Sequence, residues 1–278
     1  MTSQKTKLPP ALTSRLQEFH QGTGTLVLLT GAGISAESGI PTFRGQEGYW
    51  TIGSAEYHPR EMATMAMFRR EPLEVWSWYL YRRSVCRQAQ PNPGHAAAVR
   101  LGQSLGSRFQ LITQNVDGLH LRAGHPQETT WQIHGNVDFR RCAAACGTGI
   151  LPVPEGLHPW VKGRCLSQEE ARILLCSCGA LTRPHVLWFD EFYDEENFRF
   201  DSSIRAASNA ALLIVVGTSG ATNLPIQVGQ AALGNGATII DINPDPNPFS
   251  AMAEQAETGF FLQGEAGRWL PALASVLA

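Results

Sequence analysis

The sequence of 278 residues lacks an apolar run long enough to cross a bilayer: the longest, residues 210–216, is far shorter than the ~20 residues that a membrane-spanning helix needs. It also lacks an excess of one charge, because 22 Lys and Arg stand against 24 Asp and Glu, for a net charge of -2. This balance excludes the strong fields that attract nucleic acids and acidic membrane surfaces. Residues 1–10 contain no apolar core of a signal peptide. We therefore expect a cytoplasmic protein that binds neither nucleic acid nor membranes.

Charged residues are scarce overall. They make up 17% of the chain against an average of ~25% for globular proteins, whereas 43% of the residues are apolar. This composition excludes a mainly disordered chain, and the length allows one large domain or two unequal ones.

Cysteine is also scarce, with six residues, but five of them fall between positions 142 and 178. Such clustering in a reducing compartment points to a metal site rather than to a disulfide scaffold.

Short apolar segments alternate with helical ones along most of the chain. Strands are expected at residues 25–29, 109–113, 211–216 and 237–242, a helix beginning at 34–38, and further helices at 93–105 and 225–233. Continuous apolar strands are typical of a parallel sheet whose two faces are both covered by helices. Two segments interrupt the alternation: residues 41–90, with an aromatic helix at 71–86, and residues 142–178, with helical periodicity confined to 167–175. We therefore expect an α/β fold in which these two segments form a second, smaller module.

A glycine-rich turn follows the first expected strand. Gly31-x-Gly33-x-x-Ala36 matches the dinucleotide loop, in which glycines let the backbone approach a pyrophosphate at the start of a helix. A tight strand-to-helix turn without a ligand is the simpler alternative. A dehydrogenase would next show a second strand that ends in an acidic residue about 20 positions later, and the following segment contains none. The adenosine-ribose ligand is better sought at Asp241 or Asn243, which disfavours hydride transfer.

Five segments together resemble the sirtuin family, in sequence and in order. They are residues 30–45 (TGAGISAESGIPTFRG), 113–120 (TQNVDGLH), 133–135 (IHG), 183–191 (RPHVLWFDE) and 217–219 (GTS). The similarity extends over residues 26–273, and motifs of this length are highly specific. Sirtuins are NAD-consuming lysine deacylases. The resemblance implies a Rossmann-like NAD-binding domain with a parallel sheet at 11–48, 91–136 and 183–278, and a smaller zinc-ribbon and helical module at 49–90 and 137–182.

The resemblance also implies roles for the matched residues. His134 corresponds to the base that deprotonates a ribose hydroxyl after the acyl oxygen of acyl-lysine has displaced nicotinamide, and the near-neutral pKa of histidine suits this task. The residues implied to bind NAD are Gly31, Ala32, Gly33, Ser35, Phe43, Arg44, Gln114, Asn115, Asp117, Gly217, Thr218, Ser219 and Asn243. The simpler alternatives are that His134 is a packed structural histidine and that Asn115 and Asp117 form an Asx turn before a helix.

Four of the clustered cysteines form two pairs, Cys142-x-x-x-Cys146 and Cys176-x-Cys178, that resemble the sirtuin zinc ribbon. Four thiolates would hold zinc tetrahedrally with no open position, so the ion would be structural. The spacing departs from the usual two intervening residues, with three in the first pair and one in the second. This departure leaves open that Cys165 replaces one ligand, or that the cysteines are free thiols.

The residues implied to bind substrate carry a more specific resemblance. Tyr79 and Arg82 lie three positions apart in the expected helix, so their side chains share one face and can meet a single ligand. This pair, with Ala63 as a small neighbour, resembles the desuccinylase and demalonylase branch of sirtuins and implies an acyl group that ends in a carboxylate. The alternative is an ordinary amphipathic helix surface. Leu187 and Phe189 are implied to contact the acyl-lysine.

One position departs from the family pattern. Asp190 stands where sirtuins usually have glycine, in the segment that pairs with the substrate peptide. Its side chain restricts the backbone and would add a negative charge beside a bound peptide.

The sequence thus predicts an NAD-dependent deacylase of protein lysines that yields nicotinamide and O-acyl-ADP-ribose and that prefers succinyl, malonyl or glutaryl over acetyl groups. Two other classes are alternatives: an NADase or ADP-ribosyltransferase on the same scaffold, and a non-catalytic NAD-binding sensor. The matched His134 and substrate segment weigh against the first. The set of Gln114, Asn115, Asp117 and His134 weighs against the second.

Overall fold

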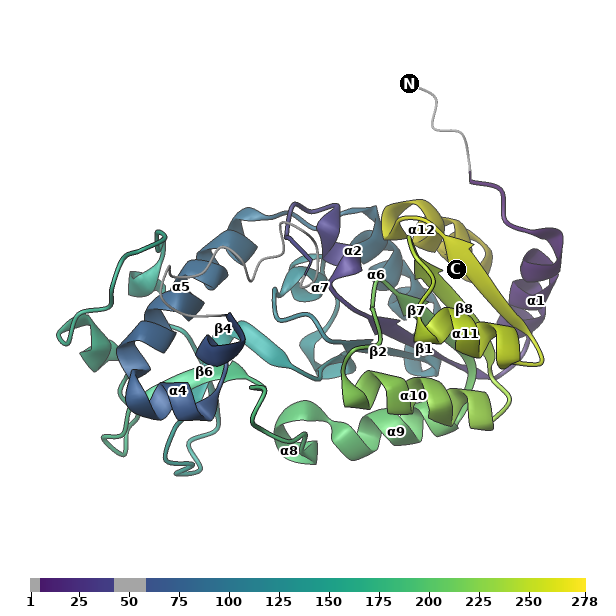
Figure 1. Ribbon diagram of the computed structural model, residues 1–278. Helices are drawn as coiled ribbons and strands as arrows, with labels where there is room; N and C mark the ends of the chain where they lie inside the picture. The colour runs from purple at the N-terminus through teal and green to yellow at the C-terminus, as the bar shows by residue number, and fades with distance from the viewer. Residues whose placement is uncertain (1–5, 43–58) are drawn as a thin grey trace, which may run out of the picture.

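The computed structural model describes residues 6–42 and 59–278 of the chain. Figure 1 shows two parts: a larger one in which helices flank a sheet, and a smaller one built around α5 (Pro72–Gln88), with the strands β4 (Gly135–Cys142) and β6 (Thr182–Val186) beside it. The predicted fold class, an α/β protein with a parallel sheet and a smaller second part, is therefore confirmed. The domain boundaries given above stay a prediction.

The larger part contains a six-stranded sheet in the order β3-β2-β1-β7-β8-β9, and every pairing in it is parallel. Its strands are β1 (Thr25–Thr30), β2 (Phe109–Thr113), β3 (Thr130–Gln132), β7 (Ala210–Val216), β8 (Thr238–Asn243) and β9 (Gly259–Gln263). The four strands predicted from apolar runs are confirmed to within one residue at each end. The two edge strands, β3 and β9, are not among those predictions.

Alternate residues of the strands point to opposite faces of this sheet, and both faces are buried. In β1, Leu26 and Leu28 join one apolar core and Val27 and Leu29 join another, and each is at most 1% exposed. The helices that close the first core are α1 (Pro10–Gln21), α6 (Pro93–Leu105) and α12 (Ala266–Leu277), and those that close the second are α9 (Phe200–Ser208), α10 (Asn223–Gly234) and α11 (Pro248–Gln255). Burial on both faces explains why these strands are continuous apolar runs.

A third apolar core fills the smaller part, where α5 packs against the antiparallel sheet β5-β4-β6. The other elements there are α3 (Pro59–Met62), α4 (Met65–Arg70) and β5 (Ile150–Pro152). Buried Trp76 of α5 donates from Nε1 to the Thr182 carbonyl at 2.7 Å. Arg83 and Arg87 donate from Nε to one oxygen of Asp138 at 2.8 and 2.7 Å. These bonds attach α5 to both β4 and β6.

Two expected helices are shorter than the sequence suggests. The helix after the glycine turn is the single turn α2 (Gly33–Ala36), and the periodic segment at 167–175 contains only the 3-10 turn Glu170–Leu174. A single turn sums few peptide dipoles, so an anion beside α2 would depend on individual N–H groups. The remaining short elements are α7 (Leu119–Arg122), α8 (Glu195–Phe198) and the 3-10 turns Gly106–Arg108, Gln127–Thr129 and Glu155–Leu157.

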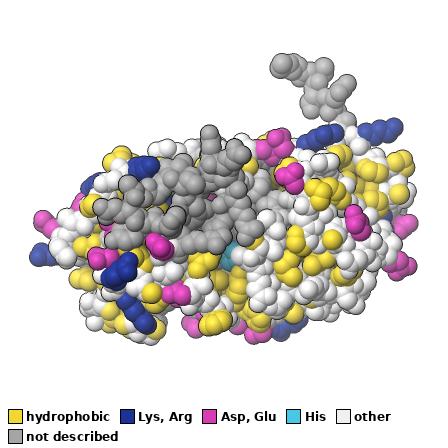
Figure 2. Space-filling model, in the orientation of Figure 1, with side chains coloured by type: hydrophobic (Ala, Val, Ile, Leu, Met, Phe, Trp, Pro, Cys, Tyr) yellow, Lys and Arg dark blue, Asp and Glu magenta, His cyan; other side chains and the backbone are white. Residues whose placement is uncertain are grey.

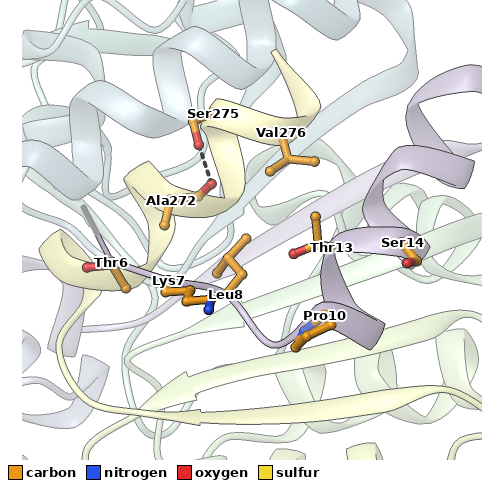
Figure 3. A pocket seen from close by; sticks show the side chains of 9 residues that line it. All are labelled: Thr6, Lys7, Leu8, Pro10, Thr13, Ser14, Ala272, Ser275 and Val276. Carbon is orange, nitrogen blue, oxygen red and sulfur yellow. Dashed lines mark hydrogen bonds between the residues drawn. The ribbon is translucent and has the colours of Figure 1, made fainter.

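The described surface carries charges of both signs, and acidic and basic side chains are interspersed on the face in Figure 2. An open cavity of about 440 Å³ lies between the N-terminal segment and α12, where Lys7, Thr13 and Val276 are among its lining residues (Figure 3). It contains none of the residues that the sequence links to NAD, acyl-lysine or metal. Across residues 6–42 and 59–278, no helix combines the length and the apolar character needed to span a membrane.

Three buried histidines of the described core are held neutral. Burial lowers the pKa of His95 and of His185 to about 4, and that of His120 well below its ordinary value. His95 is 0% exposed, and its Nδ1 accepts from the Asn92 backbone N–H at 3.3 Å in the capping box of α6. The charge of Arg122 lowers the pKa of His95 further. Protonation of these rings therefore opposes folding.

Glutamine at position 95 should reduce the loss of stability at acid pH. The unfolded chain binds a proton at His95 near the ordinary pKa of 6.5 and the folded chain only near about 4, so this contribution to stability is complete above pH 6.5 and is lost as the pH falls toward 4. His95→Gln keeps an acceptor in the capping box. It should remove about 2 kcal/mol of the stability loss between about pH 7 and pH 5. Urea unfolding at both pH values measures the effect, and equal losses in the two proteins would contradict it.

Candidate functional site

Two glycine turns meet at the carboxyl ends of β1 and β7, where the strand order of the sheet reverses direction. Gly33 donates from its backbone to the Gly217 carbonyl at 2.7 Å, and a Cβ on Gly33 would lie 2.6 Å from Gly217 Cα. Gly217 has φ of +63°, which side chains disfavour. A Cβ on Gly31 would lie 2.6 Å from Thr218 Cβ. The glycines are therefore required by the contact between the two turns, and the N–H groups of Gly31, Gly33 and Gly217 all donate to backbone carbonyls.

The segment after β2 brings polar side chains to the same edge of the sheet. Asn115 donates from Nδ2 to the Gly31 carbonyl at 3.0 Å and to Ser35 Oγ at 3.1 Å. Ser35 donates to Asp117 Oδ2 at 2.7 Å, and the backbone of Leu119 donates to Asp117 Oδ1 at 2.8 Å. Burial raises the pKa of the Asp117 carboxyl. Asp117 does form the Asx turn of the simpler alternative, but its second oxygen belongs to a network with Ser35 and Asn115.

Gln114 joins this network to the loop after β7. Its Nε2 donates to Thr218 Oγ1 at 2.9 Å, and its Oε1 accepts from Thr222 Oγ1 at 3.1 Å. Thr218 is buried, Ser219 is exposed and Ala32 is half-buried. The sequence motifs do not include Thr222. The one feature of the sequence that could have pointed to it is its position shortly before a predicted helix. Gln114 Nε2 also donates to the Thr30 carbonyl at 3.4 Å, so Gln114 contacts both β1 and the loop after β7.

The end of β8 carries the two candidates for a ribose ligand. Asn243 donates from Nδ2 to Asp241 Oδ1 at 2.5 Å, and Asn247 donates from Nδ2 to Asp241 Oδ2 at 2.6 Å. Burial raises the pKa of Asp241 to about 6, and the two amides oppose this shift. Both carboxylate oxygens of Asp241 are occupied by these bonds, which favours Asn243 as the ribose candidate.

His134 lies in the turn between β3 and β4. Its Nε2 is 2.7 Å from the hydroxyl of Tyr193, and its backbone carbonyl accepts from the Leu187 N–H at 3.0 Å. Loss of hydration lowers the pKa of His134 to about 4, and the backbone carbonyl of Gln114 partly offsets this effect. The ring is therefore neutral at pH 7 and can accept a proton. It is a weaker base than the near-neutral pKa expected from the sequence implies.

The segment after β6 gathers the residues implied to bind substrate. Phe189 donates from its backbone to the Ala63 carbonyl at 3.0 Å, and its side chain is half exposed. Trp188 donates from Nε1 to the Tyr79 hydroxyl at 2.9 Å. Leu187, directly before it, is half-buried. Trp188 lies within a matched motif, but the resemblance assigned it no role, and its contact links the substrate segment to α5.

Tyr79 and Arg82 share one face of α5, and both are buried. Their exposed fractions are 2% and 7%. The guanidinium carbon of Arg82 lies 5.3 Å from the ring centre of Tyr79 and 4.6 Å from that of Trp78. Burial raises the pKa of Tyr79, an effect that Arg82 opposes, so the hydroxyl keeps its proton. The interpretation of this pair as helix surface is therefore wrong.

Asp190 has a structural use that the sequence does not reveal. Its two carboxylate oxygens accept from the backbone N–H groups of Met65, at 2.8 Å, and Ala66, at 3.1 Å, in the first turn of α4. A negative charge at a helix N-terminus is stabilising. The carboxylate is thus committed to the start of α4, close in the chain to Ala63, instead of standing alone beside a bound peptide.

An ion pair between buried Arg183 and half-buried Glu191 lies against the substrate segment. Arg183 is 2% exposed, pairs with both oxygens of Glu191, and donates to the Val186 carbonyl at 2.9 Å. Its guanidinium carbon lies 3.5 Å from the ring centre of Trp188. Glu191 Oε2 also accepts from the Trp188 backbone N–H at 3.0 Å. Trp188 is therefore held by both partners of the pair in the orientation that reaches Tyr79.

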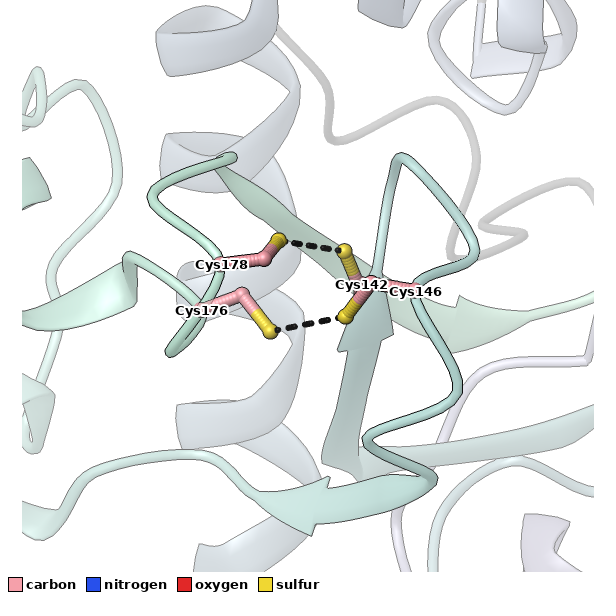
Figure 4. Close-up of side chains that lie close together, drawn as sticks. All are labelled: Cys142, Cys146, Cys176 and Cys178. Carbon is pink, nitrogen blue, oxygen red and sulfur yellow. Dashed lines mark hydrogen bonds between the residues drawn. The ribbon is translucent and has the colours of Figure 1, made fainter.

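Four cysteines of the smaller part face one another (Figure 4). The sulfurs of Cys142 and Cys178 are 3.5 Å apart, as are those of Cys146 and Cys176. All four sulfurs lie within 4.8 Å of one another, and Cys165 is exposed and outside this group. The structure thus gathers the four predicted ligands and contradicts the alternative in which Cys165 replaces one of them.

Comparison with known proteins agrees with this geometry. The model of the Sir2 family matches residues 31–223. An NAD-dependent protein deacylase of Leptospira interrogans is 41% identical over 245 residues, covering 88% of this chain and 89% of that protein. NAD-dependent protein deacylase 2 of Pyrobaculum aerophilum is 39% identical over 247 residues, covering 89% and 88%. The chain belongs to the Sir2 family.

Solved structures of Sir2 homologues share the whole fold. A mutant of a Sir2 homologue in complex with ADP-ribose matches with a TM-score of 0.77 at 33% identity, covering 97% of this chain and 96% of that one. A Sir2 homologue in complex with NAD matches with a TM-score of 0.74 at 33% identity, covering 98% and 95%. The sirtuin resemblance is thus confirmed. Phe43 and Arg44 of the Sir2 motif lie outside the described residues.

The cysteine cluster of this Sir2-family chain fits zinc. Tetrahedral coordination with Zn–S bonds of about 2.3 Å places sulfurs about 3.8 Å apart, and the observed separations run from 3.5 Å to at most 4.8 Å. Four sulfur donors leave no position for a substrate, so the ion would hold the end of β4 to the loop that precedes β6. Zinc would therefore stabilise the smaller part and would not contact the substrate.

Cys178→Ser should therefore lose zinc that Cys165→Ser retains. The unmodified protein, purified without chelator, should carry about one equivalent of zinc, and removal of one thiolate should release it and destabilise the smaller part. Elemental analysis and thermal unfolding of the three proteins measure both effects. Cys165 is the matched control, because it is a cysteine of the same segment outside the cluster. Absence of zinc from the unmodified protein, or equal zinc in both variants, would contradict this assignment.

Proposed function

We propose that this Sir2-family chain removes acidic acyl groups (succinyl, malonyl or glutaryl) from protein lysines while consuming NAD. The broader activity, NAD-dependent protein deacylation, follows from its family. The observation that carries the acidic preference is the buried pair of Tyr79 and Arg82 on α5. Trp188 donates to Tyr79, and its neighbour Leu187 donates to the His134 carbonyl, so one short segment lies between this pair and His134.

NAD, as co-substrate, supplies the ribose whose bond to nicotinamide breaks when the acyl oxygen of the lysine attacks C1′. The phosphates would bind beside the contact between the turns of Gly31, Gly33 and Gly217, where the hydroxyls of Thr218 and Ser219 can donate to them. These positions agree with ligand binding at the carboxyl ends of parallel strands.

Amide and carboxyl side chains would bind the other parts of NAD. The network of Ser35, Asn115 and Asp117 is buried, and such a set of amide, hydroxyl and carboxyl groups suits the carboxamide of nicotinamide. Gln114 would contact the nicotinamide ribose, since it lies between the turn after β1 and the loop after β7. Asn243, held by Asp241, would bind the adenosine ribose.

His134 would act as general base after nicotinamide has left. Its neutral ring has a lone pair with which to take a proton from a ribose hydroxyl, which can then attack the acyl carbon. The backbone bond from Leu187 to the His134 carbonyl keeps the substrate segment beside this ring. The base is required for the second step and not for the departure of nicotinamide.

The acyl group would end against Arg82 and Tyr79. A guanidinium buried in an apolar core is stabilised by a carboxylate, with which it forms charge-assisted bonds. The Tyr79 hydroxyl accepts from Trp188 Nε1, so its own proton remains for donation to the acyl carboxylate. Ala63 is buried, and its small side chain would obstruct a longer acyl chain less than a larger residue would. Acetyl-lysine has no carboxylate to offer Arg82 and Tyr79.

His134→Ala should retain NAD binding and lose most deacylation. General-base losses run from ~100-fold to ~10,000-fold, and the binding groups for NAD lie on other elements. NAD affinity by calorimetry and product formation by mass spectrometry measure the two effects. Turnover near that of the unmodified enzyme would rule out His134 as the base.

Arg82→Met should lower desuccinylation selectively and spare or improve deacetylation. Loss of a charge-assisted bond worth ~1.5 to 3 kcal/mol corresponds to about a tenfold to hundredfold loss in kcat/KM for succinyl-lysine. Arg69→Met is the matched control, because it removes an exposed guanidinium from α4. The measurement compares kcat/KM on paired acetyl and succinyl peptides for all three proteins.

The unmodified enzyme gives the decisive comparison. If its kcat/KM for acetyl-lysine equals or exceeds that for succinyl-lysine, the acidic preference is wrong. An equal loss on both peptides in Arg82→Met would instead assign Arg82 to the stability of α5.

A further inference from the structure

Trp188 links the substrate segment to the pair of Tyr79 and Arg82, although the sequence assigns it no role. Its side chain is 1% exposed, and its Nε1 lies 2.9 Å from the Tyr79 hydroxyl. The two residues are 109 positions apart in the chain: Trp188 follows β6, and Tyr79 lies within α5. The fold therefore brings an indole N–H to the hydroxyl that is proposed to bind the acyl carboxylate.

The chemistry of the two groups allows only one direction for this hydrogen bond. An indole nitrogen donates and does not accept, so the Tyr79 oxygen is the acceptor. Burial raises the pKa of Tyr79, and the hydroxyl is therefore protonated at pH 7. A phenol hydroxyl has one proton and two lone pairs, so accepting from Trp188 leaves its proton available for donation. A donor to the phenol oxygen also polarises the O–H bond, which strengthens that donation.

Tyr79 in turn contributes to the surroundings of Arg82. The guanidinium carbon of Arg82 lies 5.3 Å from the ring centre of Tyr79 and 4.6 Å from that of Trp78. The two rings meet edge to face, with their centres 4.8 Å apart. A displacement of the Tyr79 ring would therefore disturb both the position of its hydroxyl and the cation–π contact with Arg82. The bond from Trp188 opposes such a displacement.

Trp188 is held in place by groups other than Tyr79. Its ring packs on Phe68, with ring centres 5.4 Å apart, and the guanidinium carbon of Arg183 lies 3.5 Å from its ring centre. Its backbone N–H donates to Glu191 Oε2 at 3.0 Å. These contacts fix the indole ring and the peptide unit that precedes it. Trp188 can therefore orient Tyr79 without depending on it.

We propose that Trp188 is a positioning residue for acyl selectivity, which holds the Tyr79 hydroxyl in the orientation that donates to the terminal carboxylate of an acidic acyl group. This inference rests on the proposed preference for acidic acyl groups and adds a residue on which that preference depends. Trp188 acts through Tyr79, so it favours acyl groups that end in a carboxylate and not acetyl-lysine. The indole N–H, rather than the size of the ring, produces the effect.

Trp188→Phe tests this role by removing the indole N–H while keeping an aromatic ring. Loss of one orienting hydrogen bond should lower kcat/KM for a succinyl-lysine peptide about threefold to tenfold. The value for the matching acetyl peptide and KM for NAD should stay as in the unmodified enzyme, because neither acetyl-lysine nor NAD is proposed to contact Tyr79. The ratio of the two kcat/KM values is the measured quantity.

Trp76→Phe is the matched control. Trp76 belongs to the same apolar core, is also 1% exposed, and donates from Nε1 to the Thr182 carbonyl instead of to Tyr79. Both variants lose one buried indole N–H and the same number of ring atoms. Only Trp188→Phe should therefore change the ratio of succinyl to acetyl activity.

Two further measurements separate positioning from packing. Benzothienylalanine in place of Trp188 keeps the shape of the indole and has sulfur instead of the N–H, so it should reproduce the selective loss without a cavity. In the Tyr79→Phe background, Trp188→Phe should cause no further loss on the succinyl peptide, because the hydroxyl through which it acts is absent. Thermal unfolding of each variant checks that the fold is retained.

The outcomes distinguish this inference from the proposed function. If Arg82→Met removes a preference for succinyl-lysine but both replacements of Trp188 keep it, the positioning role is wrong and the acidic preference stands. An equal loss on both peptides, or a loss that adds to that of Tyr79→Phe, would assign Trp188 to packing alone and overturn the inference. If the unmodified enzyme prefers acetyl-lysine, the acidic preference and this inference both fall.

Discussion

The loops after β1 and β7 approach so closely that neither can carry a side chain at the point of contact. The 2.7 Å bond from Gly33 to Gly217 leaves no room for a Cβ on either residue. The parallel pairing of β1 with β2 and with β7 places the ends of the three strands at one edge, and this contact brings the turns that follow β1 and β7 together there. Asn115 reaches the Gly31 carbonyl, and Gln114 reaches Thr218, only because the turns are this near. A single backbone approach thus organises polar groups from three strands.

The smaller part contributes buried aromatic and charged side chains to the site, whereas the parallel sheet contributes its glycine turns and polar side chains. Its apolar core buries the ring of Trp188, which is held by the pair of Arg183 and Glu191 and donates to Tyr79. Removing a partner from a buried ion pair is costly, because the other charge remains buried without compensation. The shape of the substrate segment is therefore set by an internal salt bridge, and the carboxylate of Asp190 adds a second attachment at the start of α4.

Local sequence was sufficient for features that depend on local chemistry. The central strands appear as apolar runs because both their faces are buried, whereas three-residue β3 and half-buried β9 at the edges do not. The motifs identified Gly33, Asn115 and His134. Contacts between distant segments were beyond reach: Trp188 with Tyr79, and Tyr193 with His134, join residues 109 and 59 positions apart. The cysteine spacing was ambiguous for the same reason, since only the fold shows that Cys165 lies outside the cluster.

The backbone of His134 is bonded to the substrate segment, and its side chain lies near the end of the parallel sheet. Its backbone carbonyl is bonded to Leu187, and Gly135 pairs with Val186 in the adjoining ladder, so the ring and the substrate segment form one mechanical unit. The carbonyl of Gln114, by contrast, belongs to the end of the parallel sheet. Any displacement of this unit would therefore move His134 and the segment around Leu187 together.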